Sequence, residues 1–208
     1  AYNGAKKGRK HLISTAFEHH AILHTLDALK KEGFEVTLLS VSPDGFVTAE
    51  QVRDAIRPDT ALVSVMYANN EIGTVQPIRE IGAVCRAAGV VFHTDAVQAV
   101  GHIPVDVQAD NVDMLSLSAH KFHGPKGTGV LYVRRGIPLQ PLIRGGAQER
   151  NLRAGTENLP SFLAMTAALE EAVSRLPDRM ARRMARLAHM RDRLIDGILA
   201  IPHTVLNG

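Results

Sequence analysis

The sequence has no tryptophan, a single cysteine and few aromatic residues, which make up 4% of its 208 residues. A lone cysteine cannot form an internal disulfide and suits a reducing compartment, so we expect a cytoplasmic protein. The scarcity of aromatic side chains argues against a site built from stacked rings, such as a sugar site or a single-stranded nucleic-acid site. No apolar run is long enough to cross a membrane, and the first residues lack a signal-peptide pattern.

A strong net charge is also lacking. The formal charge is +3, and the apolar and charged contents of 45% and 22% are ordinary for a soluble globular protein. The arginines of the C-terminal third lie along one amphipathic helical pattern, where a solvated basic face is the simplest interpretation. We therefore predict no nucleic-acid partner and no membrane association. The length allows one full domain and the beginning of a second.

Short apolar runs alternate with helical patterns along the chain. Strands are predicted at residues 12–16, 35–39, 61–66, 90–93, 112–117 and 130–133, and helices at 21–31, 48–56, 78–88, 159–176 and 178–199. The strands are continuously apolar and are separated by helices, which indicates an α/β fold with a mainly parallel sheet covered on both faces. The first ten residues predict a loose entry segment, and the last six predict the start of another strand.

Chemistry is expected where the carboxyl ends of parallel strands converge. Four predicted strand ends are followed by polar clusters, at residues 18–20, 69–73, 94–98 and 118–121. Each has an ordinary explanation when taken alone. An Asn pair favours a turn, Asp95 can cap a helix, and the adjacent His19 and His20 point apart on a helix, which argues against a metal pair.

The four clusters together match the needs of pyridoxal phosphate. This cofactor requires a lysine amine, a carboxylate for its ring nitrogen, a flat group against its ring and donors for its phosphate. Lys121 is placed at the end of a buried strand, where burial favours the neutral, nucleophilic form of an amine, whereas Lys126 lies in an exposed-looking glycine loop. Scattered histidines disfavour zinc, and we predict no metal site. A dinucleotide site is disfavoured because no G-x-G-x-x-G follows the first strand.

The ordered set of motifs closely resembles the cysteine desulfurases, pyridoxal-phosphate enzymes of the class V aminotransferase branch, and is nearest the nitrogenase and iron–sulfur-cluster type. The resemblance covers nearly the whole chain. It rests on Phe17-Glu18-His19-His20-Ala21, Asn69-Asn70-Glu71-Ile72-Gly73, His93-Thr94-Asp95-Ala96-Val97-Gln98, Ser118-Ala119-His120-Lys121, Gly124-Pro125-Lys126-Gly127, residues 144–150 and residues 153–158. It implies the large domain of a fold-type I transferase, truncated, over residues 1–172, with a connecting helix and the start of a small domain over 173–208.

The resemblance also implies roles around the cofactor ring. Lys121 would hold the cofactor as a Schiff base and later move protons between it and the substrate α-carbon. His19 would stack on the pyridine ring and take part in acid–base steps. Asp95 would pair with the pyridine nitrogen, and Gln98 would hydrogen-bond the phenolic oxygen.

Further roles implied by the resemblance concern the phosphate, the substrate and the partners. Ser118 and His120 would contact the phosphate, and Thr156 would reach the phosphate of a neighbouring subunit, which predicts a homodimer. Asn70 would help to hold the carboxylate of L-cysteine. The family reaction gives L-alanine and a persulfide, whose sulfur passes to an iron–sulfur scaffold protein.

The sequence departs from the family at the nucleophile. Family members carry a catalytic cysteine on a mobile loop downstream of the last residue here, whereas Cys85 lies within a predicted helix, where a buried structural thiol is the better interpretation. The phosphate-binding turn that precedes residue 1 in the family and most of the small domain are also missing. His102, His123, His189 and His203 show no partner pattern and are assigned to the surface or to loops.

Two alternatives stay open. Another enzyme of the same branch, such as a selenocysteine lyase or an aminotransferase, would share these motifs. A binding module that holds cofactor or a sulfur-accepting partner without catalysis would fit the absent nucleophile, although the combination of Lys121, Asp95 and His19 argues against it.

We predict that the 208-residue chain alone has little or no desulfurase turnover, because it lacks the loop cysteine that accepts sulfur. Sulfide release from L-cysteine in the presence of pyridoxal phosphate and a thiol reductant measures this. Release at a rate typical of an enzyme would contradict the prediction.

Overall fold

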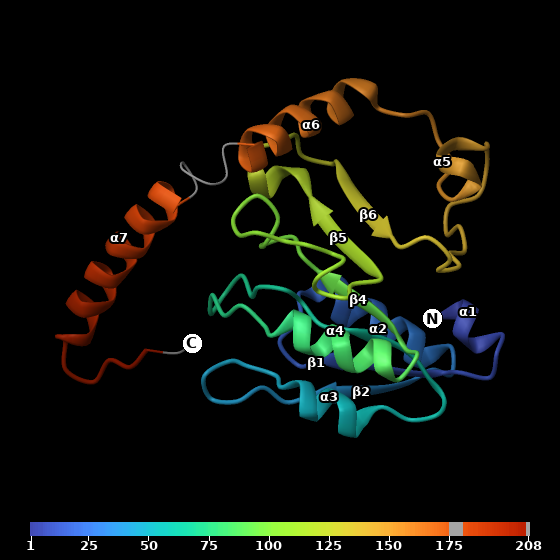
Figure 1. Cartoon of the computed structure of the whole chain (residues 1–208), viewed down its shortest axis with the longest axis horizontal. Helices are drawn as coiled ribbons and strands as arrows, with labels where there is room; N and C mark the ends of the chain where they lie inside the picture. The colour runs from blue at the N-terminus through green and yellow to red at the C-terminus, as the bar shows by residue number, and fades with distance from the viewer. Residues whose placement is uncertain (175–180, 207–208) are drawn as a thin grey trace.

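A computed structural model describes residues 1–174 and 181–206 and contains one sheet in the order β2-β1-β3-β4-β5-β6 (Figure 1). The first five strands of the chain pair in parallel, and only β6 runs antiparallel to its neighbour β5. The prediction of a mainly parallel sheet is therefore confirmed. The strands are β1 (His11–Thr15), β2 (Glu35–Leu39), β3 (Thr60–Ser64), β4 (Val91–Asp95), β5 (Met114–Ser118) and β6 (Gly129–Val133).

Helices cover both faces of this sheet. They are α1 (Tyr2–Ala5), α2 (His20–Lys31), α3 (Ala49–Ala55), α4 (Ile78–Ala87), α5 (Gln148–Asn151), α6 (Leu159–Ser174) and α7 (Ala181–Leu199), with a 3-10 turn η1 (Ala119–Phe122) after β5. A capping box begins α3, since the side chains of Thr48 and Gln51 accept hydrogen bonds from each other's backbone N–H groups.

Successive side chains of the strands pack alternately into two separate hydrophobic cores. Ile13 and Val63 belong to the larger core, which also contains buried residues of α3 and α4 and is packed by α6. Leu12 belongs to the smaller core with Leu26 and Leu29 of α2. Successive residues of a strand face opposite sides of the sheet, so a strand covered on both faces is apolar throughout. This explains the continuous apolar runs of the sequence.

The order of the strands reverses between β1 and β3. The chain passes from β1 outward to β2 and then returns to place β3 on the other side of β1. Connections that leave in opposite directions open a crevice outside the carboxyl ends of the two strands. The β1–β3 boundary is therefore the place in this sheet that topology favours for a site.

Several local predictions need correction. Residues 2–5 form α1 rather than a loose segment, and Lys121 lies in η1, after the strand and not at its end. No strand forms over residues 203–206, which follow a turn at the end of α7, and residues 207–208 lie outside the described chain. The expected start of the last helix at 177–178 is also outside the described residues. The division at residue 172 stays a prediction.

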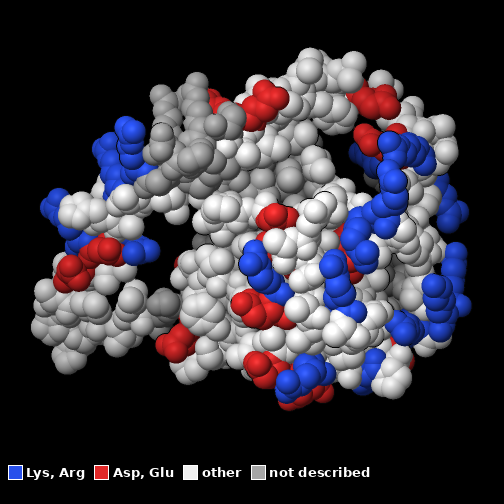
Figure 2. Space-filling view, viewed as in Figure 1, with Lys and Arg blue, Asp and Glu red and all other residues white. Residues whose placement is uncertain are grey.

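The surface carries both signs of charge. In Figure 2, Lys and Arg side chains gather along the right-hand edge and on α7, and acidic side chains are interspersed over the central face. Within residues 1–174 and 181–206, no helix has the length and apolar character needed to cross a bilayer.

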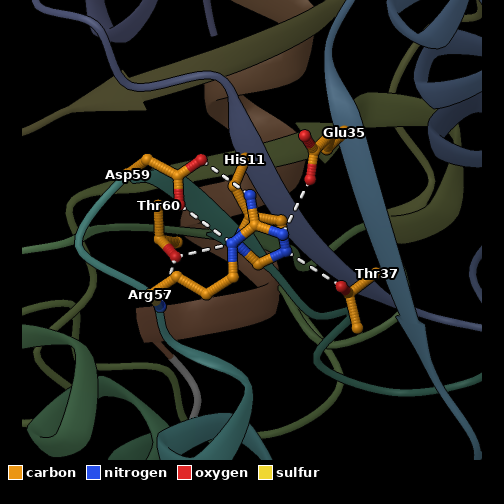
Figure 3. Close-up of polar contacts among 6 residues, drawn as sticks. All are labelled: His11, Glu35, Thr37, Arg57, Asp59 and Thr60. Carbon is orange, nitrogen blue, oxygen red and sulfur yellow. Dashed lines mark hydrogen bonds and ion pairs between the residues drawn. The ribbon is translucent and has the colours of Figure 1, made fainter.

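A polar cluster around the buried His11 and Thr60 lies at the amino ends of β1, β2 and β3, at the edge of the sheet opposite to the crevice (Figure 3). His11 bonds Thr60 Oγ1 at 2.8 Å through Nδ1 and Thr37 Oγ1 at 2.9 Å through Nε2. Arg57 forms ion pairs with Asp59 at 2.6 Å and Glu35 at 2.7 Å. Burial, followed by the nearby Arg57 charge, lowers the pKa of His11. This cluster fixes the start of three strands.

We predict that Thr60→Val lowers the free energy of unfolding by about 1–3 kcal/mol, because it removes the partner of the buried His11 Nδ1 and of the half-buried backbone N–H of Arg57. Urea unfolding measures this. Thr25→Val is the control, since Thr25 is exposed on α2 and surface changes stay within about 0.5 kcal/mol. Equal effects of the two changes would contradict the assigned role of the cluster.

Candidate active site

The turn between β1 and α2 carries the first predicted site residue, His19. It is the N-cap of α2, and its Nδ1 accepts a hydrogen bond of 3.1 Å from the Ala21 N–H. This bond leaves the proton of a neutral ring on Nε2. The imidazole is exposed, so its face is free to contact a ligand in the crevice.

Glu18, immediately before His19, is buried and was not assigned a role by sequence reasoning. Its Oε1 accepts hydrogen bonds from the Thr15 hydroxyl at 2.8 Å and the Met66 N–H at 2.7 Å. Within the described residues its Oε2 has no hydrogen-bond partner. Burial raises the pKa of Glu18 to about 8. A glutamate before a histidine gives no signal of burial in sequence, because glutamate is usually exposed.

Asp95 ends β4 and is only 7% exposed. Its Oδ1 accepts a hydrogen bond of 3.0 Å from the Val97 N–H, so it caps a turn rather than a helix. Burial raises the pKa of Asp95, while the hydrogen bond from the Val97 N–H and, to a smaller extent, the His19 imidazole lower it. The half-buried Gln98 follows in the same turn.

The turn η1 brings Ser118, His120 and Lys121 to the end of β5. Ser118 Oγ and His120 Nδ1 are hydrogen-bonded at 2.9 Å. Ala119 and Phe122 are buried, and Lys121 is half-buried between them. Because β5 neighbours β4 in the sheet and Asp95 is in register with Ser116, the lysine turn and Asp95 occupy adjacent strand ends.

His102 has a partner that sequence reasoning did not find. Its Nε2 donates a hydrogen bond of 2.9 Å to the backbone carbonyl of Lys121. Gly101 makes this approach possible, because its φ is +81° and a Cβ there would lie 2.7 Å from Phe122 Cβ. His102 lies in a loop, as predicted, and this bond gives it a partner that no sequence pattern indicates.

The remaining two predicted site residues lie in loops. Asn70 is exposed in the turn after β3, and the neighbouring Asn69 shapes that turn by accepting from the Glu71 and Ile72 N–H groups. Asn69 Nδ2 also donates to the Phe17 carbonyl, which brings this turn beside the one that carries His19. Thr156 is exposed between α5 and α6. None of the interactions of the described residues joins it to the other site residues.

A polar row crosses the sheet beneath the site. His93 Nδ1 is hydrogen-bonded to Ser64 Oγ at 2.8 Å and its Nε2 to Ser116 Oγ at 2.9 Å, so one ring links β3, β4 and β5. Burial lowers the pKa of His93 to about 4, and the ring is neutral at physiological pH. His93 and Asp95 are two residues apart and therefore face the same side of the sheet.

This donor set fits pyridoxal phosphate. Asp95 is a buried carboxylate for which, among the described residues, only the Val97 N–H is a donor, and a protonated pyridine nitrogen is the partner that such a group lacks. A flat imidazole, an amine and a Ser–His pair occupy the same edge of the sheet. In the described part of the chain, no three His, Cys, Asp or Glu side chains come together as metal ligands.

Comparisons with known proteins place the chain in one family. The family model "Aminotransferase class-V" matches residues 1–208. A cysteine desulfurase IscS of Methanosarcina thermophila is 51% identical over 208 residues, which are all of this chain and 50% of that protein. A solved NifS-like protein has a TM-score of 0.92 at 37% identity over 99% of this chain and 56% of its own. A structure of SspA in complex with cysteine has a TM-score of 0.78 at 45% identity over 81% and 50%.

The chain spans about half the length of the curated relatives it matches. Its one cysteine, Cys85, lies in α4 with no exposed surface, within the larger core. Burial raises the pKa of the Cys85 thiol to about 12. The prediction of a buried structural thiol is confirmed, and this thiol is unsuited to accept sulfur.

We predict that Cys85 in the native chain does not react with a thiol reagent at pH 8, because the thiolate is the reactive form and is suppressed there. With a chromogenic disulfide as the reagent, the absorbance of the released thiolate measures the reaction. One thiol per chain should react after the protein is unfolded in denaturant. Rapid labelling without denaturant would show that Cys85 is accessible.

Proposed function

Because the chain belongs to the aminotransferase class V family, we propose that it is the cofactor-binding half of a pyridoxal-phosphate-dependent cysteine desulfurase. The observation that carries the proposal is the buried carboxyl group of Asp95, to which only the Val97 N–H donates among the described residues, at the sheet edge where His19 and the turn of Lys121 also lie. The cysteine desulfurase relative supports the choice of reaction, and the SspA structure in complex with cysteine supports the choice of substrate.

When bound, pyridoxal phosphate withdraws electrons from the substrate α-carbon and allows the bond to sulfur to break. The residues of this chain would hold the cofactor in place. Asp95 as an anion would keep the ring nitrogen protonated, and the exposed face of His19 would lie against the ring. Gln98 would donate to the phenolic oxygen, and the Ser118–His120 pair would bind the phosphate.

Lys121 would bind the cofactor covalently and carry a proton to and from the substrate α-carbon. Its position is fixed through its own backbone, since His102 holds the Lys121 carbonyl while Phe122 anchors the same turn in the core. Asn70 would contact the substrate carboxylate from the turn after β3. The flexible amine is thus carried by a fixed backbone.

In the complete reaction, L-cysteine and an acceptor thiol would give L-alanine and a persulfide on the acceptor. The acceptor must lie outside this chain, because Cys85 is buried away from solvent. We propose that the parent protein is a cytoplasmic homodimer, in which Thr156 serves the partner's cofactor, and that the sulfur passes to an iron–sulfur scaffold protein.

The test is covalent capture of the cofactor. The purified chain, mixed with pyridoxal phosphate and reduced with borohydride, should carry the label on the peptide that contains Lys121, as mass spectrometry would show. Lys121→Ala should abolish this label, whereas Lys126→Ala should leave it unchanged, because Lys126 is exposed in the following loop. Labelling of Lys126 or of several surface lysines would overturn the assignment.

A further inference from the structure

The segment after β3 extends past the end of β1 and has one backbone N–H that no backbone carbonyl of β1 accepts. Residues 65–67 continue alongside β4, where the Val65 N–H donates to the His93 carbonyl and the Tyr67 N–H to the Asp95 carbonyl, at 3.2 and 2.8 Å. The Met66 N–H between them faces the other neighbour, because backbone groups alternate along a strand. That neighbour is β1, which has already ended at Thr15.

The carboxyl group of Glu18 takes the place of the missing strand carbonyl. Its Oε1 accepts the Met66 N–H at 2.7 Å and the Thr15 hydroxyl at 2.8 Å, and the residue is only 5% exposed. A side chain thus extends the hydrogen bonding between β1 and β3 past the end of the backbone ladder.

Two further hydrogen bonds hold the same turn. The Ala16 N–H donates to the Leu39 carbonyl at 2.9 Å, and Asn69 Nδ2 donates to the Phe17 carbonyl at 2.9 Å. His19 therefore follows a turn that is attached to the chain segments on both sides. The Glu18–Met66 bond differs from these two, because its acceptor is a buried carboxyl group. It also contacts the segment 65–67, whose Tyr67 N–H donates to the backbone carbonyl of Asp95.

We propose that Glu18 is a positioning residue of the pyridoxal phosphate site: its carboxyl group joins the turn that carries His19 to the segment that holds Asp95. This inference rests on the proposed function only in taking pyridoxal phosphate as the cofactor that the site binds. Glu18 does not contact the cofactor in this proposal and acts through its two neighbours.

The charges around Glu18 support a neutral carboxyl group. The elements packed against it present the Thr15 hydroxyl from β1, the Met66 N–H from the β3 extension and the Asp95 carboxylate from β4, and His19 follows in its own turn. Burial raises the pKa of Glu18 from its ordinary value of 4.5 to about 8, the two donors lower it, and Asp95 raises it. Asp95 is then left as the anion for the ring nitrogen.

The sign of the pH effect follows from this raised pKa. The neutral form is favoured in the folded chain, so its contribution to stability is complete below about pH 4.5 and is lost as the pH rises through about 8. Glu18→Gln keeps a neutral acceptor at the same place and should remove this dependence.

The first experiment needs no cofactor. The Met66 amide resonance, followed in a chain labelled with ¹⁵N-methionine and assigned with Met66→Leu, should show a step near pH 8 in the wild type, where Glu18 ionises. The step should be absent in Glu18→Gln. Glu18→Leu should remove the acceptor and increase hydrogen exchange at Met66. A step that persists in Glu18→Gln would overturn the proposal.

The second experiment measures the dissociation constant of pyridoxal phosphate from its absorbance. Glu18→Leu should weaken binding by about tenfold or more, as expected when a supporting partner is lost, and Glu18→Gln should restore wild-type binding. Thr60→Val is the matched control, since it leaves buried groups unpaired at the opposite edge of the sheet and should leave binding unchanged. Wild-type binding by Glu18→Leu, or an equal loss in Thr60→Val, contradicts a positioning role.

The two experiments separate the two proposals. If the wild-type chain takes up no cofactor, the proposed function fails, whereas the Met66 resonance still decides whether Glu18 makes its contact. If Glu18→Leu does not fold, Thr15→Val replaces it. That change removes one donor to the carboxylate, so the Met66 step should move to higher pH with the fold intact, and an unchanged step would overturn the proposal.

Discussion

Parallel strands that end at one edge of a sheet leave backbone groups of longer neighbours without partners, and a buried group in that state costs free energy. In this protein, polar side chains bond one such group, the Met66 N–H, and two backbone groups of the turns that follow β1 and β4. Glu18 accepts from the Met66 N–H, Asp95 accepts from the Val97 N–H, and Asn69 donates to the Phe17 carbonyl. Asp95 belongs to the candidate site itself, and Glu18 and Asn69 directly precede the site residues His19 and Asn70.

The positions of the carboxyl groups at this edge of the sheet also affect their charge states. Glu18 and Asp95 are both buried carboxyl groups, and burial raises the pKa of each. Only Asp95 has a cationic partner in prospect, the ring nitrogen of the proposed cofactor, so different environments give the two groups different roles. His93 is held neutral beneath them and fixes three strands through Ser64 and Ser116, which adds no competing charge.

The two edges of the sheet serve different purposes. At the amino ends, His11 is enclosed by threonine hydroxyls, and Arg57 is matched by two carboxylates. The Arg57 charge is satisfied within the cluster, which therefore has a structural role. At the carboxyl ends, groups such as Asp95 and the amine of Lys121 remain available to a ligand. The direction of the parallel strands determines which edge is which.

Some local structure could not be read from the sequence. Lys121 was expected at a strand end but lies in η1, because Phe122 is anchored in the core two residues after His120 and bends the chain there. His102 was left without a partner, since its contact is with a backbone carbonyl 19 residues away and no side-chain pattern reports it. The burial of Glu18 was missed for the same reason.

The sequence by itself determined the strand–helix alternation and the mainly parallel sheet, and it contains the motifs from which we propose residues for pyridoxal phosphate. These properties depend on hydrophobic periodicity, on cap and turn residues, and on motifs with particular chemistry, all of which are local in the chain. The tertiary structure alone decided which strand ends are neighbours, that Glu18 bonds Met66 48 residues away, and that Asp95 is influenced by His19. Such contacts arise only when the sheet order is set, because long-range packing and burial, rather than local preference, bring those groups together.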